Sequence, residues 1–299
     1  MMKLFCCCRS VVLDLDYTIH LDSCTVNTFF REYTQKSVQE YLMNFVQKYT
    51  NILRIGNNHV NLRQFNKLIF MSCILNIETS TTVCSVAASQ DGQTIFVKED
   101  LKGPSHAVSL GVFVDEALSF IDSHAIPLDA VAVSCGPGSY TGLRIGVSMA
   151  KGICYGRNIP LIGIPTLEVL SVPVLLYHDL PENALLCPMI DARRMEVYAA
   201  VYDRRLQVKR TVAADIVDEN SYLEFLNEQP VYFFGNGADK CREQITHPNA
   251  HFIDNIHPLA KMMFPLAEKV VADEDYKDVA YFEPFYLKEF VASMPKKLL

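Results

Sequence analysis

The sequence predicts an α/β protein built from two similar lobes, and three observations support this prediction. Short apolar runs of strand length alternate with longer segments of helical periodicity through most of the chain. Each half of this region begins with three strands in a row and continues with alternating helices and strands. In each half a glycine turn follows a buried strand, at residues 136–138 and 235–237. We therefore expect two lobes, residues 71–180 and 181–299, preceded by an extension over 1–70.

The first seventy residues differ in composition from the rest. They contain one glycine and no proline, and hold eight Lys and Arg against five Asp and Glu; the remainder holds nineteen against twenty-nine. Residues 11–18, Val-Val-Leu-Asp-Leu-Asp-Tyr-Thr, resemble the first motif of haloacid-dehalogenase-like phosphatases, but the segment is too short for such a domain. It is either an appendage or an upstream extension of the reading frame. We favour the extension, with Met71 as the functional start, because an apolar strand follows Met71 at once.

Three strands and a helix are predicted to open the first lobe. The expected strands are residues 73–77, 83–88 and 93–98, and the expected helix is 105–123. The apolar face of this helix is wider than packing on one sheet requires, and it is widened by Val108, Val112 and Phe120. This width indicates a second contact surface.

A glycine motif, Gly-Pro-Gly-Ser-Tyr-Thr-Gly-Leu-Arg-Ile-Gly at residues 136–146, joins a buried strand at 130–135 to a helix reaching about residue 156. Its glycines permit a tight turn, and Ser139 or Thr141 can cap the helix. Free amides at a helix start suit an anion. The motif is therefore either a phosphate cradle or a closely packed strand-to-helix connection.

The helix after the motif carries two stripes of small residues. They repeat every four residues: Gly142, Gly146 and Ala150, and Ser148, Gly152 and Gly156. Each glycine weakens a helix by roughly 1 kcal/mol relative to alanine, so close approach of a neighbour should compensate. That neighbour is either the chain's own sheet or a helix of a partner.

The same order of elements returns in the second half, after a short strand at 161–163 and a helix from 166. The expected elements are strands 184–190, 195–202 and 206–211, helix 221–228, strand 231–234, a helix to about 245, strand 251–253 and helix 258–272. This duplication is typical of a pair of ribonuclease-H-like lobes, the arrangement of actin, heat-shock chaperones and sugar kinases.

Composition disfavours several classes of protein. The net charge of −7 argues against a large nucleic-acid-binding face, which needs clustered Lys and Arg. The ten cysteines lack paired metal spacing and are interpreted as reduced, mostly buried thiols of a cytoplasmic protein. The most membrane-like segment, 159–177, is interrupted by three prolines and Glu168, and no secretory signal is convincing.

In active members of the superfamily of actin, heat-shock chaperones and sugar kinases, nucleotide phosphates lie between the lobes. They contact the turns that join the first two strands of each lobe. Here those turns are 78–82 and 191–194, where Glu78 and Asp191 could hold Mg²⁺ through water. Neither turn contains a glycine, so a phosphate could not easily approach the backbone. Both turns are at least as well interpreted as polar turns that bind no ligand. No histidine pair or activated serine is found, and we predict no catalytic or metal-binding residues.

Several segments resemble the TsaB (YeaZ) family: residues 74–81, 134–152, 190–198 and the closing Pro-Phe-Tyr-Leu at 284–287. The resemblance covers about residues 71–292. It implies a non-catalytic subunit in the formation of threonylcarbamoyladenosine on tRNA. Such a subunit pairs with a catalytic paralogue, TsaD, is joined by an ATPase, TsaE, and meets tRNA only indirectly. The paralogue's histidine-pair metal motif is absent at 164–168, which read Ile-Pro-Thr-Leu-Glu.

The resemblance places the pairing contact on the first two helices of the first lobe. The interface candidates are Val108, Val112, Phe120, Gly142, Arg144, Ile145, Gly146, Met149 and Lys151. We expect Val112→Asp or Gly146→Leu to abolish pairing and leave the fold intact. No cofactor is expected, with ATP and Mg²⁺ possible only in the assembled complex. Two alternatives use the same lobes: an ATPase or small-molecule kinase, and a stand-alone homodimer.

Overall fold

The computed structural model describes residues 3–4, 11–13, 19–20, 72–103 and 106–288. The chain divides into two units, residues 1–59 and 60–299. In the first unit the described residues form three short antiparallel strands, β1 (Lys3–Leu4), β2 (Val11–Leu13) and β3 (Ile19–His20). The two aspartates of the phosphatase-like motif and the proposed start at Met71 lie outside the described residues.

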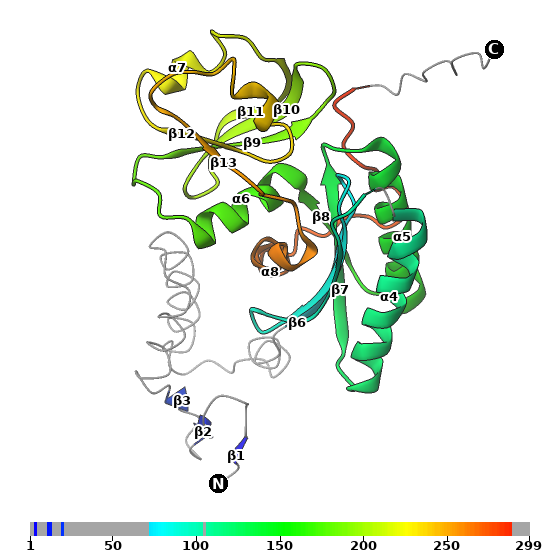
Figure 1. Ribbon diagram of the computed structural model, residues 1–299. Helices are drawn as coiled ribbons and strands as arrows, with labels where there is room; N and C mark the ends of the chain where they lie inside the picture. The colour runs from blue at the N-terminus through cyan, green and yellow to red at the C-terminus, as the bar shows by residue number, and fades with distance from the viewer. Residues whose placement is uncertain (1–2, 5–10, 14–18, 21–71, 104–105, 289–299) are drawn as a thin grey trace, which may run out of the picture. The chain divides into compact units, whose positions relative to one another are not determined.

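A five-stranded mixed sheet forms the first lobe of the second unit (Figure 1), in the order β6-β5-β4-β7-β8. Its strands are β4 (Cys73–Glu78), β5 (Cys84–Gln90), β6 (Gln93–Asp100), β7 (Leu128–Gly136) and β8 (Leu161–Pro165). The first three are antiparallel, whereas β7 and β8 run parallel to β4. Strand β4 is buried along its whole length, as expected for an apolar run covered on both faces.

Two helices, α4 (His106–Ser123) and α5 (Tyr140–Arg157), lie side by side on one face of this sheet (Figure 1). Leu110 and Val114 of α4 and Val147 of α5 enter the same core as Ile77 and Val133 of the sheet. The helix predicted over 105–123 and the one predicted to follow the glycine motif are both confirmed.

The second lobe contains another five-stranded sheet, in the order β11-β10-β9-β12-β13. Its strands are β9 (Leu185–Asp191), β10 (Glu196–Asp203), β11 (Val208–Ile216), β12 (Val231–Phe234) and β13 (Ala250–Ile253). The two sheets share one pattern, an antiparallel set of three strands extended by two parallel ones. The predicted duplication of the ribonuclease-H-like lobe is therefore confirmed.

Helix α6 (Thr166–Tyr177) lies between the two sheets and is apolar on nearly all sides. Val169 and Val172 pack with the first sheet, whereas Leu170 and Val174 pack with residues of the second. A helix that is hydrophobic all round is one that is buried all round, and α6 is therefore shared between the lobes.

The prediction that all residues from 181 onward belong to the second lobe is wrong for residues 260–273. The 3₁₀ turn η2 (Ala260–Met262) and helix α8 (Phe264–Asp273) pack on the first sheet, not the second. Met262, Leu266 and Ala267 join the core that lies opposite α4 and α5. The first sheet needs this cover because both of its faces are apolar.

Three predicted helices of the second half are also corrected. The segment expected to be helical up to residue 245 forms only the 3₁₀ turn η1 (Asp239–Cys241), although Ala238, Cys241 and Ile245 all reach the core. The helix expected at 258–272 is split into η2 and α8, and the helix expected at 221–228 shortens to α7 (Leu223–Leu226).

The glycine motif is a closely packed connection. The Ser139 amide donates to the Ser80 carbonyl oxygen (2.6 Å), and the Ser139 hydroxyl accepts from the Gly142 amide (3.2 Å). The Thr79 hydroxyl donates to the Gly142 carbonyl oxygen (2.8 Å). The turn after β4 therefore occupies the space beside the motif in which an anion would have to lie.

The two small-residue stripes of α5 have different neighbours. A Cβ at Gly142 or Gly146 would overlap Thr79, whereas a Cβ at Gly152 or Gly156 would meet no heavy atom within 4 Å. The first stripe thus accommodates the chain's own turn. Gly142 and Gly146 are not available to a partner, and the expectation that Gly146→Leu leaves the fold intact is wrong.

This difference yields a contrast within one helix. Gly142→Ala is expected to lower the free energy of unfolding by about 1–3 kcal/mol, because the added methyl group overpacks against the Thr79 carbonyl oxygen. Gly152→Ala is expected to raise it by up to about 1 kcal/mol, because alanine favours the helix and meets open space. Urea denaturation of both variants measures the two shifts, and shifts of the same sign would contradict the packing described.

Candidate functional site

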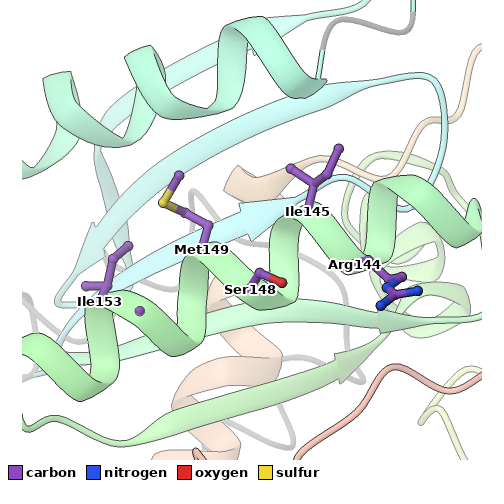
Figure 2. Close-up of a pocket in the computed structure, with 6 residues that line it drawn as sticks. Arg144, Ile145, Ser148, Met149 and Ile153 are labelled. Carbon is purple, nitrogen blue, oxygen red and sulfur yellow. The ribbon is translucent and has the colours of Figure 1, made fainter.

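A shallow groove of about 610 Å³ runs along the exposed face of α5 (Figure 2). Its lining residues share this helix: Arg144, Ile145, Ser148, Met149, Gly152 and Ile153. Ile145, Met149 and Ile153 follow one another at four-residue spacing, so their side chains form an apolar row on one side of the helix. Gly152 adds no side chain, which leaves the groove open at that point.

Arg144 forms the polar end of the groove. Its Nη1 donates to the Tyr140 hydroxyl (2.7 Å), and its guanidinium lies 5.3 Å from the centre of the Tyr140 ring. Tyr140 in turn contacts the ring of Tyr286, with the ring centres 4.9 Å apart. A cation held against an aromatic ring is fixed in position while still presenting charge to the solvent.

Five of the nine predicted interface residues lie where a partner can reach them. Arg144, Ile145 and Met149 line the groove, and on the adjacent helix α4 the side chains of Val108 and Val112 are 79% and 54% exposed. Exposed valines on a helix beside an apolar groove extend the apolar surface onto α4.

The other four predicted residues are engaged within the chain. Gly142 and Gly146 pack on Thr79, as described above. Lys151 donates from Nζ to the carbonyl oxygens of Ala280 and Phe282 (3.0 Å each), so Arg144 is the candidate cation that remains directed at a partner. Phe120 is half-buried between the rings of Phe96 and His124.

Three groove residues were not predicted: Ser148, Gly152 and Ile153. Two of them belong to the second small-residue stripe, so the sequence signal was present. Periodicity alone does not say which of two stripes faces the chain's own sheet, because both repeat every four residues.

Glu78, the first candidate magnesium ligand, is fully buried at the end of β4. One carboxylate oxygen accepts from the Ser80 amide (2.6 Å), and the other has no hydrogen-bond partner among the described residues. Burial raises the pKa of the Glu78 carboxyl, against the opposing effect of nearby donors such as Ser80 and Ser134. A raised pKa opposes cation binding, because a cation must displace the proton of a carboxyl that it binds.

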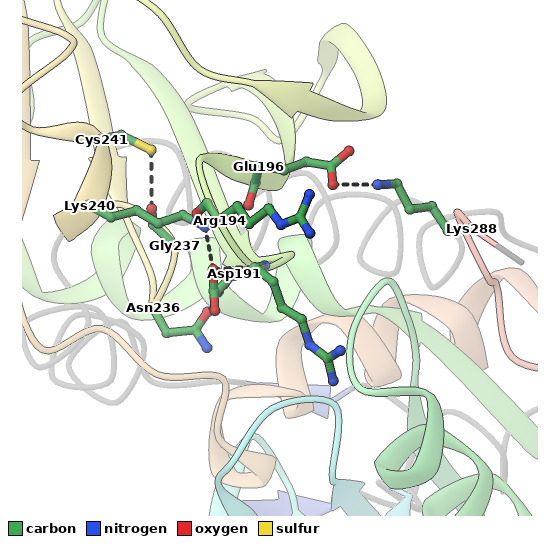
Figure 3. A network of polar contacts seen from close by, with 9 residues as sticks. Asp191, Arg194, Glu196, Asn236, Gly237, Lys240, Cys241 and Lys288 are labelled. Carbon is green, nitrogen blue, oxygen red and sulfur yellow. Dashed lines mark hydrogen bonds and ion pairs between the residues drawn. The ribbon is translucent and has the colours of Figure 1, made fainter. Parts of the chain in front are cut away.

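Asp191, the second candidate, lies in a network of polar contacts at the β9–β10 hairpin (Figure 3). The Lys240 ammonium donates to Asp191 and to the carbonyl oxygens of Arg194 (2.6 Å) and Glu196 (2.7 Å), so its three protons are all used. The ammonium group thus already supplies Asp191 with a positive charge. Asp191 also accepts from the Arg193 amide (3.1 Å), which shapes the turn.

The described part of the chain offers little else for chemistry. It holds no group of three or more His, Cys, Asp or Glu side chains arranged to bind a metal ion. Its cysteines are free, and burial raises the pKa of Cys135, beside the glycine motif, to about 12, which disfavours a thiolate nucleophile. Within these residues no helix is both long and apolar enough to cross a bilayer.

Comparison with known proteins gives a consistent result. Residues 100–296 match the family model described as TsaD, tRNA N6-adenosine threonylcarbamoyltransferase. The chain is 31% identical to the Bacillus subtilis tRNA threonylcarbamoyladenosine biosynthesis protein TsaB, over 58% of this chain and 74% of that protein. It is 29% identical to the Escherichia coli protein of the same name, over 73% of this chain and 96% of that protein.

Solved structures agree in fold. YeaZ from Pseudomonas aeruginosa superposes with a TM-score of 0.62 at 23% identity and covers 73% of this chain and 100% of its own. At that identity the likeness supports the two-lobe fold, while the sequence relatives and the family model identify the family. The chain therefore belongs to the TsaB (YeaZ) family and carries a TsaD-type domain.

Proposed function

We propose that this protein is a non-catalytic subunit in tRNA threonylcarbamoyladenosine biosynthesis, which pairs through α4 and α5 with a catalytic TsaD-type paralogue. The relatives' names supply the pathway. The observation that carries the pairing role is the α5 groove, with its apolar row and the exposed valines of α4 beside it. Contact between tRNA and this chain is indirect in this proposal, and the ATPase TsaE joins the assembled pair.

The chemistry of the groove fits a protein partner. Its apolar row offers area to bury, and Arg144 at one end offers a fixed charge that can meet an acidic group. Arginine anchors surrounded by apolar contacts are typical of residues that contribute most to protein–protein binding. A second helix laid along α5 could approach closely at Gly152, where no side chain intervenes.

Two glycines of α5 give a matched test of pairing. Gly152→Glu places a charged side chain in the groove and is expected to weaken binding of the paralogue by at least about tenfold, because the carboxylate would be desolvated against an apolar partner. Gly156→Glu makes the same change one turn later, also in open space but outside the groove lining, and is expected to bind like the parent. Isothermal titration with the purified paralogue measures both affinities.

Folding is not at risk in this comparison, because both glycines meet open space. Equal affinities of the parent and Gly152→Glu would overturn the proposed interface. Size-exclusion analysis of each chain alone identifies the homodimer alternative, which predicts that Gly152→Glu converts a dimer into a monomer in the absence of the paralogue.

We further propose that Glu78 and Asp191 maintain structure in this chain and do not hold a magnesium nucleotide. The burial of Glu78 and the ion pair between Asp191 and Lys240 support this. The enzyme alternative needs both carboxylates to be charged and accessible. Calorimetry with ATP and Mg²⁺ on the isolated chain separates the two, since tight binding would favour an ATPase or kinase.

A pH experiment tests the state of Glu78. The pKa of Glu78 is raised in the folded protein, so its bound proton stabilises the folded state at low pH. This stabilisation is lost as the pH rises from 4.5, the ordinary pKa of a glutamate, through the raised pKa of Glu78. Glu78→Gln mimics the protonated form, so its stability relative to the parent is expected to grow with pH by up to about 1.4 kcal/mol per unit. Denaturation from about pH 5 to 8 measures the difference. A constant difference would show that Glu78 is charged throughout, as a metal ligand must be.

A further inference from the structure

The described residues after α8 cross the first lobe and reach the second lobe at Lys288. We name residues 274–288 the C-terminal strap. The Lys277 amide donates to the Leu161 carbonyl oxygen of β8 (2.8 Å), and the ring of Phe282 lies over Gly163 of the same strand. The Lys151 ammonium of α5 holds the Ala280 and Phe282 carbonyl oxygens. The first part of the strap is therefore fixed by a partly buried ring and by hydrogen bonds.

The Phe285 backbone packs closely on Gly136, but the side chains of the last part of the strap make more exposed contacts. The Phe285 amide donates to the Cys135 carbonyl oxygen (2.7 Å), but the Phe285 side chain is 47% exposed. Tyr286 contacts Tyr140 at the start of α5, and Lys288 forms an ion pair with Glu196 of β10 (Figure 3). Lys288 is 46% exposed in that pair, and such pairs contribute little to stability, so this end is the part of the strap that can open.

These contacts connect the α5 groove to the second lobe. Arg144 at the groove's end holds Tyr140, Tyr140 contacts Tyr286, and two residues later Lys288 reaches Glu196. Glu196 closes the β9–β10 hairpin, because its backbone carbonyl accepts from Lys240 and its amide donates to the Arg193 carbonyl oxygen. A group bound at Arg144 would therefore contact the side chain that holds Tyr140, and Tyr140 is the ring against which Tyr286 of the strap packs.

We propose that the end of the strap, residues 285–288, is a conformational latch that closes between α5 and the β9–β10 hairpin, and that a partner seated in the α5 groove stabilises the closed form. The regulatory part rests on the proposed pairing function; the latch itself does not. Because linkage is reciprocal, loosening the latch must weaken partner binding even though no latch residue lines the groove. The latch also gives a role to the closing Pro-Phe-Tyr-Leu motif, which the pairing face leaves unexplained.

Hydrogen exchange on the full chain tests the latch without a partner. Lys288→Ala and Tyr286→Ala are expected to speed exchange of the Phe285 amide by about 5-fold or more and to leave the Lys277 amide unchanged, because only the end opens. Tyr281→Ala is the control, since Tyr281 is on the same strap but its side chain is 85% exposed. Equal acceleration at both amides would mean that the strap opens as a whole, and no acceleration would mean that these contacts do not hold it; either result refutes the latch.

Adding the paralogous TsaD-type protein tests the regulation. The parent's Phe285 amide is expected to exchange at least about 5-fold more slowly in the complex, and Tyr286→Ala is expected to weaken pairing by a similar factor while Tyr281→Ala does not. If the parent fails to pair, the proposed function fails and the latch stands on the free-chain result. If the parent pairs but Tyr286→Ala pairs equally well and Phe285 protection is unchanged, the regulatory proposal fails and the pairing function stands.

Discussion

The contact between the turn after β4 and the first two glycines of α5 fixes the position of the helix on which the proposed function depends. Thr79 occupies the space that side chains at Gly142 and Gly146 would fill, and its hydroxyl donates to the helix backbone. The glycines cost the helix intrinsic stability, and close packing with a hydrogen bond offsets that cost. As a result α5 lies tightly against the first sheet with its opposite stripe turned outward.

One helix therefore serves two neighbours. Its inner stripe belongs to the fold, and its outer residues, including Ser148 and Gly152, form the groove proposed to receive a partner. A surface built on a helix so firmly packed is preorganised, which reduces the ordering cost of binding. The same packing fills the space beside the glycine motif. This explains why a motif that resembles an anion-binding turn here makes a structural connection.

The lobes are joined by apolar packing in one place and by polar contacts in another. Helix α6 buries apolar residues against both sheets, so separating the lobes there would expose apolar surface to water. The C-terminal strap makes a second connection that ends in an exposed ion pair between Lys288 and Glu196. The contrast in burial explains why we assign a movable role to the strap and a static one to α6.

The sequence by itself determined the class of fold, the order of nearly all elements and the family, because these follow from local periodicity and from long motifs. It also marked both stripes of α5. Only the tertiary structure decided which stripe faces Thr79, that Lys151 is used by the strap, and that residues 260–273 cover the first sheet. Those outcomes depend on contacts between residues far apart in the chain, whose packing no local pattern records. The raised pKa of Glu78 is of the same kind, because the enclosing fold, and not the residue's neighbours in sequence, removes its carboxyl from water.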